Sequence, residues 1–165
     1  MLEWISQVDG QILLFIQDSL RAPVLTAFFS FFSIIGNSGI VWILLGLALL
    51  IFQKTRRAGL DMLLCLLFCF IVNNLILKEL IARPRPYVTL DNLTIALDQF
   101  ANLDAHSFPS GHACSSFACA YALTRAFGGK GALVYIPATC IALSRPYIGV
   151  HYVTDILAGA LVGTL

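Results

Sequence analysis

The placement of charged residues along this 165-residue chain restricts its possible folds more than any other feature of the sequence. Four long segments, residues 22–53, 62–77, 105–124 and 131–144, contain no Asp, Glu, Lys or Arg. A helix needs roughly 20 mostly apolar residues to cross a hydrocarbon core about 30 Å thick, and several of these segments approach that length. With 59% hydrophobic and only 12% charged residues, the chain has too few polar side chains to cover a soluble domain. The sequence therefore predicts an integral protein of the cell membrane.

The composition also excludes other classes of protein. A disordered chain has few hydrophobic residues, which is the opposite of what is found here. Ten Lys and Arg against nine Asp and Glu give a formal net charge of +1, without the basic excess of a nucleic-acid-binding domain. We therefore expect a lipid bilayer as the environment of the protein and no nucleic-acid partner.

We predict an all-α fold, namely a polytopic six-helix transmembrane bundle with an N-terminal interfacial helix, in a single domain over residues 1–165. In residues 1–20 apolar side chains recur at three- and four-residue intervals among polar ones. This pattern is typical of an amphipathic helix that lies in the membrane interface. The predicted spans then cover about residues 22–35, 40–53, 58–82, 110–127, 132–144 and 151–165.

Two of these spans are less well defined than the others. The first apolar run is short and ends at the turn-forming residues 36–39. Five spans, or a re-entrant segment over residues 22–52, therefore remain an alternative. Residues 151–165 would extend only about 22 Å at 1.5 Å per residue, so we expect the last span to be short or truncated.

Residues 83–109 form the long polar connection of the chain, and we expect an outer loop there with a short helix near residues 93–100. Each X-Pro step at its start disfavours helical backbone in the residue before the proline. Basic residues in short loops favour the cytoplasm, and Lys54, Arg56 and Arg57 form the densest basic cluster. The sequence therefore predicts that this cluster is cytoplasmic and that residues 83–109 are extracytoplasmic.

Three short motifs lie at the predicted outer ends of spans. They are Lys78 with Arg85-Pro86, then Pro109-Ser110-Gly111-His112, and finally Ser144-Arg145 with His151 and Asp155. Lys and Arg are usually enriched on the cytoplasmic side, so positive charge on the outer side suggests a specific function there. Under the predicted topology all three motifs lie at one level of the membrane.

The first two motifs are suited to binding an anion. Lys78 lies in the last turns of the third span, and the prolines hold Arg85 in extended backbone just beyond it. Both cations can therefore approach the same anion. Ser110, Gly111 and His112 lie where a helix begins, and the unpaired N–H groups of a helix start attract anions.

The third motif supplies a candidate nucleophile. His151 and Asp155 are four residues apart, which places both side chains on one face of a helix. The carboxylate can then accept the Nδ1 proton and leave Nε2 free and more nucleophilic. Arg145 adds a planar fork of donors that matches phosphate oxygens.

Each of these features also has a structural explanation when it is taken alone. Lys78 could extend to the interface, and Arg83 fits no motif role. His106 is expected to be a loop residue, and Asn73 and Asn74 are expected to form hydrogen bonds between helices. The combination of three motifs on one side of the membrane nevertheless favours a catalytic site.

Together, the three motifs resemble the signature of the type 2 phosphatidic acid phosphatase superfamily, and every motif position matches. The resemblance covers residues 78–155 and implies a metal-independent membrane lipid phosphatase with a six-helix core. It implies that His151 is the nucleophile, that Asp155 orients it, and that His112 is the general acid and then the general base. It also implies a set of residues that hold the phosphoryl group, namely Lys78, Arg85, Ser110, Gly111 and Arg145.

The expected substrate is a lipid phosphate or pyrophosphate in the membrane. Undecaprenyl pyrophosphate is our first expectation, and phosphatidylglycerol phosphate or phosphatidic acid is the alternative. A vanadium haloperoxidase-like enzyme and a non-catalytic membrane scaffold or transporter are remoter alternatives. We expect no metal and no cofactor, because no ligand set completes the Cys65–Cys69 pair and three cations can do the work of a metal ion.

Overall fold

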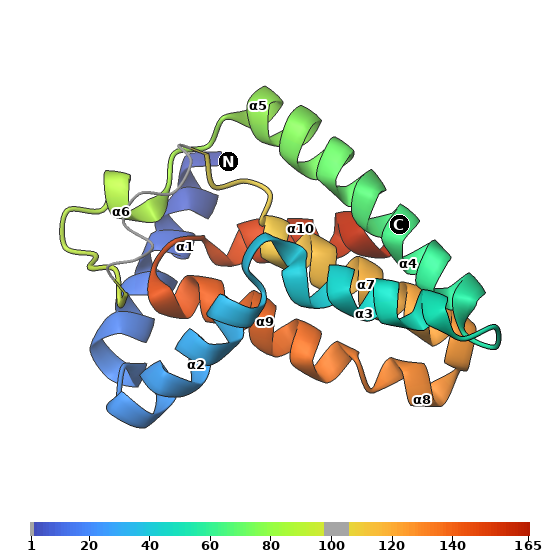
Figure 1. Ribbon diagram of the computed structural model, residues 1–165. Coiled ribbons are helices and arrows are strands. Elements are labelled where there is room, and N and C mark those ends of the chain that lie inside the picture. The colour runs from blue at the N-terminus through green and yellow to red at the C-terminus, as the bar shows by residue number, and fades with distance from the viewer. Residues whose placement is uncertain (1, 98–105) are drawn as a thin grey trace.

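Helices form the framework of the computed structural model, which describes residues 2–97 and 106–165 (Figure 1). Within these ranges the one strand-like pairing is an isolated bridge between Pro84 and His106, so the all-α prediction is confirmed. The helices in chain order are α1 (Leu2–Phe15), η1 (Ile16–Leu20), α2 (Pro23–Ile35), η2 (Asn37–Gly39), α3 (Ile40–Ile51), α4 (Arg56–Cys69), η3 (Phe70–Leu77), α5 (Lys78–Ile81), α6 (Pro86–Thr89), α7 (Gly111–Phe127), α8 (Gly129–Ala132), α9 (Tyr135–Ile148) and α10 (Val153–Thr164).

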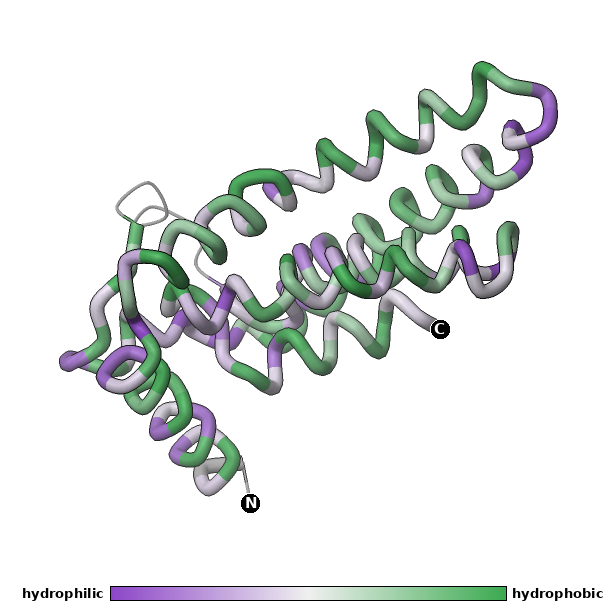
Figure 2. Tube along the Cα trace, turned by 90° about the horizontal axis from the view of Figure 1, so that it is seen from below, coloured by the Kyte–Doolittle hydropathy of each residue, from purple (hydrophilic) through white to green (hydrophobic). Residues whose placement is uncertain are grey.

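The predicted span over residues 58–82 coincides with one long apolar helix. The elements α4, η3 and α5 form a continuous helix of 26 residues, Arg56–Ile81. Figure 2 shows hydrophilic residues in the loop that joins α3 to this helix. Among the described residues, it is the one helix that is long and apolar enough by itself to cross a membrane. It ends where Ala82 takes a left-handed conformation, φ +47°, directly before the Arg83-Pro84 step.

The predicted spans 22–35 and 40–53 form two helices that meet at a bend. The helices α2 and α3 are joined through η2 at an angle of 45°, and only as a pair do they reach the length of a span. Gly39, at φ +65°, takes a left-handed backbone conformation at the bend. The alternative of one broken or re-entrant segment therefore agrees with the described helices, and six complete spans are not confirmed.

The helices α7 and α10 pack closely because two glycines of α10 face the α7 backbone. A Cβ atom at Gly159 would lie 2.4 Å from the carbonyl oxygen of Ser110, and one at Gly163 would lie 2.3 Å from that of Cys114. Small residues four positions apart allow two helix backbones to approach in this way. The close approach brings the start of α10 to the start of α7, where the second and third motifs lie.

The last two predicted helices have different bounds in the structure. The predicted span 132–144 becomes α9, which continues through Arg145 and Pro146 to Ile148. Gly149, at φ +94°, then supplies the left-handed residue that ends a helix. The predicted span 151–165 becomes α10, which begins at Val153, so His151 lies in the connection before the helix.

The N-terminal segment is helical, as predicted for residues 1–20, and one of its faces packs against the protein. Asp9 and Leu13 are buried, whereas Trp4 and Phe15 are exposed. The expected helix near residues 93–100 is wrong for residues 93–97, which are not helical, and residues 98–100 lie outside the described ranges. The short helix of this loop is α6 instead, because Pro86 at its first position presets the helical φ angle.

Candidate functional site

Residues of all three sequence motifs line one cavity of about 660 Å³. These residues are Lys78, Arg85, Gly111, His112, Arg145 and His151. A further part of the wall is apolar and comes from α3, α4 and η3, with Ile43, Leu63, Leu66, Leu67 and Phe70. The cavity therefore joins a cluster of cations and histidines to a hydrophobic surface.

The first motif places two cations at the cavity, one from a helix and one from extended backbone. Lys78 is buried at the start of α5 in the long helix, while Arg85 lies in extended backbone at φ −71° and ψ 150°. Ser107 holds this extended strap in place, because its N–H donates to the carbonyl of Arg83 at 2.8 Å and its hydroxyl to that of Pro84 at 3.2 Å. The strap is thereby attached to the segment that leads into α7.

The second motif forms the start of α7, as its sequence predicts. Ser110 has extended backbone before the first helical residue, and its N–H donates to the carbonyl oxygen of Asp155 at 3.0 Å. Its buried hydroxyl has no hydrogen-bond partner among the described residues, and Ser110 is not one of the residues that line the cavity. A Cβ atom at Gly111 would lie 3.2 Å from Oδ1 of Asn74, so a side chain there would press on the η3 helix.

Asn73 connects the long helix to the same region. Its Nδ2 donates to the carbonyl oxygen of Pro109 at 3.3 Å. Pro109 lies before the first residue of α7, so this bond joins the helix to a connecting segment and not, as expected, to another helix. The contact ties the middle of the long helix to the residue that precedes the second motif.

Ser33 of α2 contacts two site residues, and the sequence did not indicate it. Its carbonyl oxygen lies 3.3 Å from Nε2 of His112, and its hydroxyl accepts a hydrogen bond from the guanidinium of Arg145. A carbonyl oxygen can only accept, so this contact places a hydrogen on Nε2 of His112. A serine inside an apolar helix carries no local signal of such a role.

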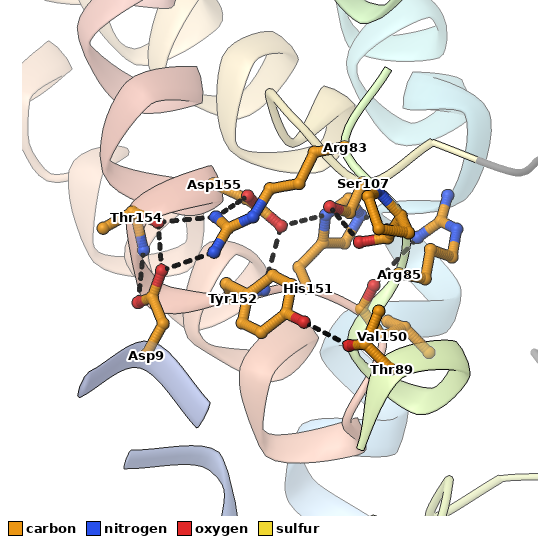
Figure 3. Close-up of polar contacts among 11 residues, drawn as sticks. Asp9, Arg83, Arg85, Thr89, Ser107, Val150, His151, Tyr152, Thr154 and Asp155 are labelled. Carbon is orange, nitrogen blue, oxygen red and sulfur yellow. Dashed lines mark hydrogen bonds and ion pairs between the residues drawn. The ribbon is translucent and has the colours of Figure 1, made fainter. Parts of the chain in front are cut away.

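The expectation that His151 and Asp155 share a helix face is wrong. Asp155 is the third residue of α10, and its Oδ2 accepts the N–H of Tyr152 at 2.9 Å. This capping contact starts the helix after Tyr152 and leaves His151 outside it. The two side chains still meet, with Nδ1 of His151 3.5 Å from Oδ2 of Asp155 (Figure 3).

The neighbours of His151 determine which ring nitrogen carries its hydrogen. The Arg85 guanidinium, which can only donate, lies 3.3 Å from Nε2, so Nε2 is the acceptor and Nδ1–H faces Asp155. Burial in the connection before α10 lowers the pKa of His151 to about 4, although the nearby Asp155 carboxylate acts in the opposite direction. The imidazole is therefore neutral at pH 7, with the lone pair of Nε2 beside the cavity.

Arg83 was expected to have no specific role, and the structure corrects this interpretation. Its guanidinium donates to Oδ1 of Asp155 at 2.7 Å and to Oδ2 of Asp9 at 2.9 Å (Figure 3). No sequence signal could have found this contact, because Asp9 and Asp155 are far from Arg83 in the chain. His106, taken as a loop residue, lies 3.6 Å from a carboxylate oxygen of Glu79, outside the residues that line the cavity.

The described part of the chain contains no group of three or more His, Cys, Asp or Glu side chains arranged to hold a metal ion. All five cysteines are free thiols. The groups that can bind an anion at the cavity are the three cations Lys78, Arg85 and Arg145 and the start of α7.

Comparisons with known proteins point to one family. The model of the PAP2 superfamily matches residues 58–165. The chain is 32% identical over 126 residues to an undecaprenyl-diphosphatase of Sulfolobus acidocaldarius, which covers 75% of this chain and 59% of that protein. It is 36% identical over 138 residues to phosphatidylglycerophosphatase B of Bacillus subtilis, covering 74% and 61%. The chain thus spans about three-fifths of the length of these two relatives.

Two solved structures have a similar fold. The transmembrane PAP2-type phosphatidylglycerolphosphate phosphatase of Bacillus subtilis superposes with a TM-score of 0.74 at 29% identity, covering 97% of this chain and 81% of the other. LpxE of Aquifex aeolicus superposes with a TM-score of 0.79 at 29% identity, covering 93% and 88%.

Proposed function

The chain belongs to the PAP2 superfamily, and from that premise we propose that it is a metal-independent lipid phosphatase of the cell membrane. One observation carries the proposal. The cavity presents three cations and two histidines from the predicted motifs, and it continues along an apolar wall. A phosphorylated lipid has the same two parts, an anionic head group and a hydrocarbon chain.

The residues around the cavity can perform the reaction in two displacements. In the first, Nε2 of His151 attacks the terminal phosphorus, the bond from this phosphorus to the oxygen of the leaving lipid or lipid phosphate breaks, and protonated His112 gives that oxygen its proton. The positive charge that develops on the imidazole faces Asp155. In the second, water attacks the phosphohistidine, His112 takes its proton, and inorganic phosphate leaves as the P–N bond breaks.

Charge stabilisation in this scheme comes from donors fixed before the substrate arrives. Phosphoryl transfer depends mainly on positioning and on neutralising the oxygens of the transferred group. We assign this role to Lys78, Arg85 and Arg145, with Ser110 and Gly111 at the start of α7. The Arg85 guanidinium, which contacts Nε2 of His151, can turn to a phosphoryl oxygen and leave Nε2 free to attack.

Undecaprenyl pyrophosphate is the substrate that we propose first, supported by the similarity to the undecaprenyl-diphosphatase. Phosphatidylglycerol phosphate is the second candidate, supported by the Bacillus subtilis enzyme of similar sequence and the one of similar structure. Phosphate release from undecaprenyl pyrophosphate, phosphatidylglycerol phosphate and phosphatidic acid should be measured with purified protein in detergent. We expect the highest kcat/KM for the first, and the His151→Ala variant shows the background rate.

The outcomes of this panel separate the alternatives. A higher kcat/KM for phosphatidylglycerol phosphate would reverse the order of substrates and keep the phosphatase. No release from any lipid by folded protein would favour a scaffold or transporter. Vanadate should inhibit as a phosphate analogue, and halide oxidation in its presence would instead support a haloperoxidase-like enzyme.

Chelators are expected to leave the activity nearly unchanged, because Lys78, Arg85 and Arg145 supply the positive charge that a metal ion supplies elsewhere. Phosphate release should be compared before and after dialysis against EDTA, with and without added magnesium. Loss of activity in EDTA and its recovery with magnesium would show that the assignment of these three cations is wrong.

The site is expected to face the extracytoplasmic side, because the basic cluster of Lys54, Arg56 and Arg57 favours the cytoplasm. Asn92 is exposed in the loop after α6, so Asn92→Cys can be introduced after the five native cysteines are replaced. An impermeant maleimide should label this cysteine in intact cells. A matched Gln53→Cys variant, exposed beside the basic cluster, should react only after permeabilisation. The reverse pattern would invert the topology and leave the phosphatase proposal intact.

A further inference from the structure

Both carboxylate oxygens of Asp155 have defined partners. Oδ2 accepts the N–H of Tyr152 and lies 3.5 Å from Nδ1 of His151. Oδ1 accepts a hydrogen bond of 2.7 Å from the Arg83 guanidinium. Arg83 therefore holds one oxygen of the carboxylate, while the other oxygen faces His151 (Figure 3).

Arg83 is itself held on several sides. The nitrogen that bonds Asp155 also donates to the hydroxyl of Thr154 at 2.7 Å. The guanidinium lies over the ring of Tyr152, 3.8 Å from its centre. Its other terminal nitrogen donates to Asp9 of α1. An arginine held by two carboxylates and an aromatic ring has little freedom to turn away from Asp155.

Asp9 connects the N-terminal helix to this arrangement. It is 2% exposed, and its Oδ1 accepts the N–H of Thr154 in the first turn of α10 at 3.2 Å. Its Oδ2 accepts from the Thr154 hydroxyl and from Arg83. A carboxylate from α1 thus satisfies a free N–H at the start of α10 and balances the charge of Arg83.

We propose that Arg83 and Asp9 are positioning residues for the reaction, acting on His151 through Asp155. The chain of contacts runs from Asp9 to Arg83, then to Asp155, and ends at Nδ1 of His151. It holds the carboxylate in the orientation that keeps hydrogen on Nδ1 and leaves Nε2 free. This inference rests on the proposed phosphatase function, and it makes α1 a structural part of the site.

Kinetics of Arg83→Gln test the proposal, with Arg57→Gln as the matched control, because Arg57 is exposed at the start of α4. Groups that orient a metal-binding imidazole contribute about 10- to 100-fold to activity. We expect a loss of kcat in that range for Arg83→Gln, with KM nearly unchanged and added guanidinium partly restoring Arg83→Ala. Asp9→Asn should lower kcat in the same way but less.

A double-mutant cycle then separates positioning from a general loss of stability. If Arg83 acts through Asp155, Arg83→Gln should lower kcat far less in an Asp155→Asn background than in the wild type. Multiplicative losses would overturn the proposal. Equal kcat for Arg83→Gln and Arg57→Gln would also overturn it, even if the melting temperature of the former falls.

The role of Arg83 can also be tested by a measurement that does not depend on enzyme activity, so that it is tested separately from the proposed phosphatase function. The ¹⁵N shifts of the His151 ring report which nitrogen carries hydrogen. We expect the Nδ1–H form in the wild type and in Arg57→Gln, and a mixture of forms in Arg83→Gln. Wild-type protein without phosphatase activity would refute the proposed function alone, whereas an unchanged His151 tautomer in Arg83→Gln would refute the role of Arg83.

Discussion

Replacing His151 with alanine is expected to abolish turnover, lowering kcat by roughly five to six orders of magnitude, as removal of a covalent nucleophile does elsewhere. His151 lies at the cavity with Nε2 as an acceptor. The second histidine at the cavity, His112, directs its Nε2 to the carbonyl of Ser33. Of the two histidines that line the cavity, we therefore assign the covalent intermediate to His151.

The measurement combines steady-state phosphate release with trapping of labelled phosphate on the protein by rapid quenching. Wild type should yield acid-labile phosphohistidine and His151→Ala none. His106→Ala is the matched control, since His106 lies outside the cavity beside Glu79, and it should retain both activity and label. Substantial turnover by folded His151→Ala would exclude His151 as the nucleophile.

Arg145→Lys is expected to lower kcat by about 100- to 1,000-fold, the range found when one transition-state donor is removed. Arg145 is 1% exposed in the last turn of α9, and its guanidinium donates to Ser33. A planar guanidinium can bond Ser33 and still present parallel donors to a phosphoryl group. An ammonium keeps the charge and loses that geometry.

Because Arg145→Lys keeps the positive charge, it tests whether the geometry of the guanidinium is required. Arg125→Lys is the matched control, because Arg125 is exposed in the last turn of α7, and its activity should equal that of the wild type. Phosphate release and the melting temperature should be measured for both variants. An Arg145→Lys variant with nearly full kcat would mean that positive charge alone is required at this position.

The predicted helices that agree best with the structure are those whose ends depend on local signals. The span predicted at 58–82 is found as Arg56–Ile81, and the one predicted at 110–127 is found as α7, Gly111–Phe127. Proline steps, glycines and charged residues end helices through contacts with their nearest neighbours in the chain. The prediction of a helix near residues 93–100 is wrong for its described part. The helix of this loop is α6, which begins at Pro86, seven residues before the start that was predicted.

The site could be predicted as a set of residues but not as a geometry. The sequence pattern identified Lys78, Arg85, His112, Arg145 and His151, and the structure brings them to one cavity. Spacing suggested that His151 and Asp155 meet on a helix face. They meet instead across a helix start, because the carboxylate caps Tyr152.

The sequence by itself predicted a membrane protein, located its long apolar helix and indicated the side chains that the structure brings to one cavity. Those properties depend on apolar content, on local backbone preferences and on motif spacing, all of which can be read along the chain. Only the tertiary structure decided that Ser33 contacts His112 and Arg145, and that Asp9 and Arg83 hold Asp155. Those contacts join residues between about 70 and 150 positions apart, and they form because close packing, such as that of α10 on α7 at two glycines, brings distant segments together.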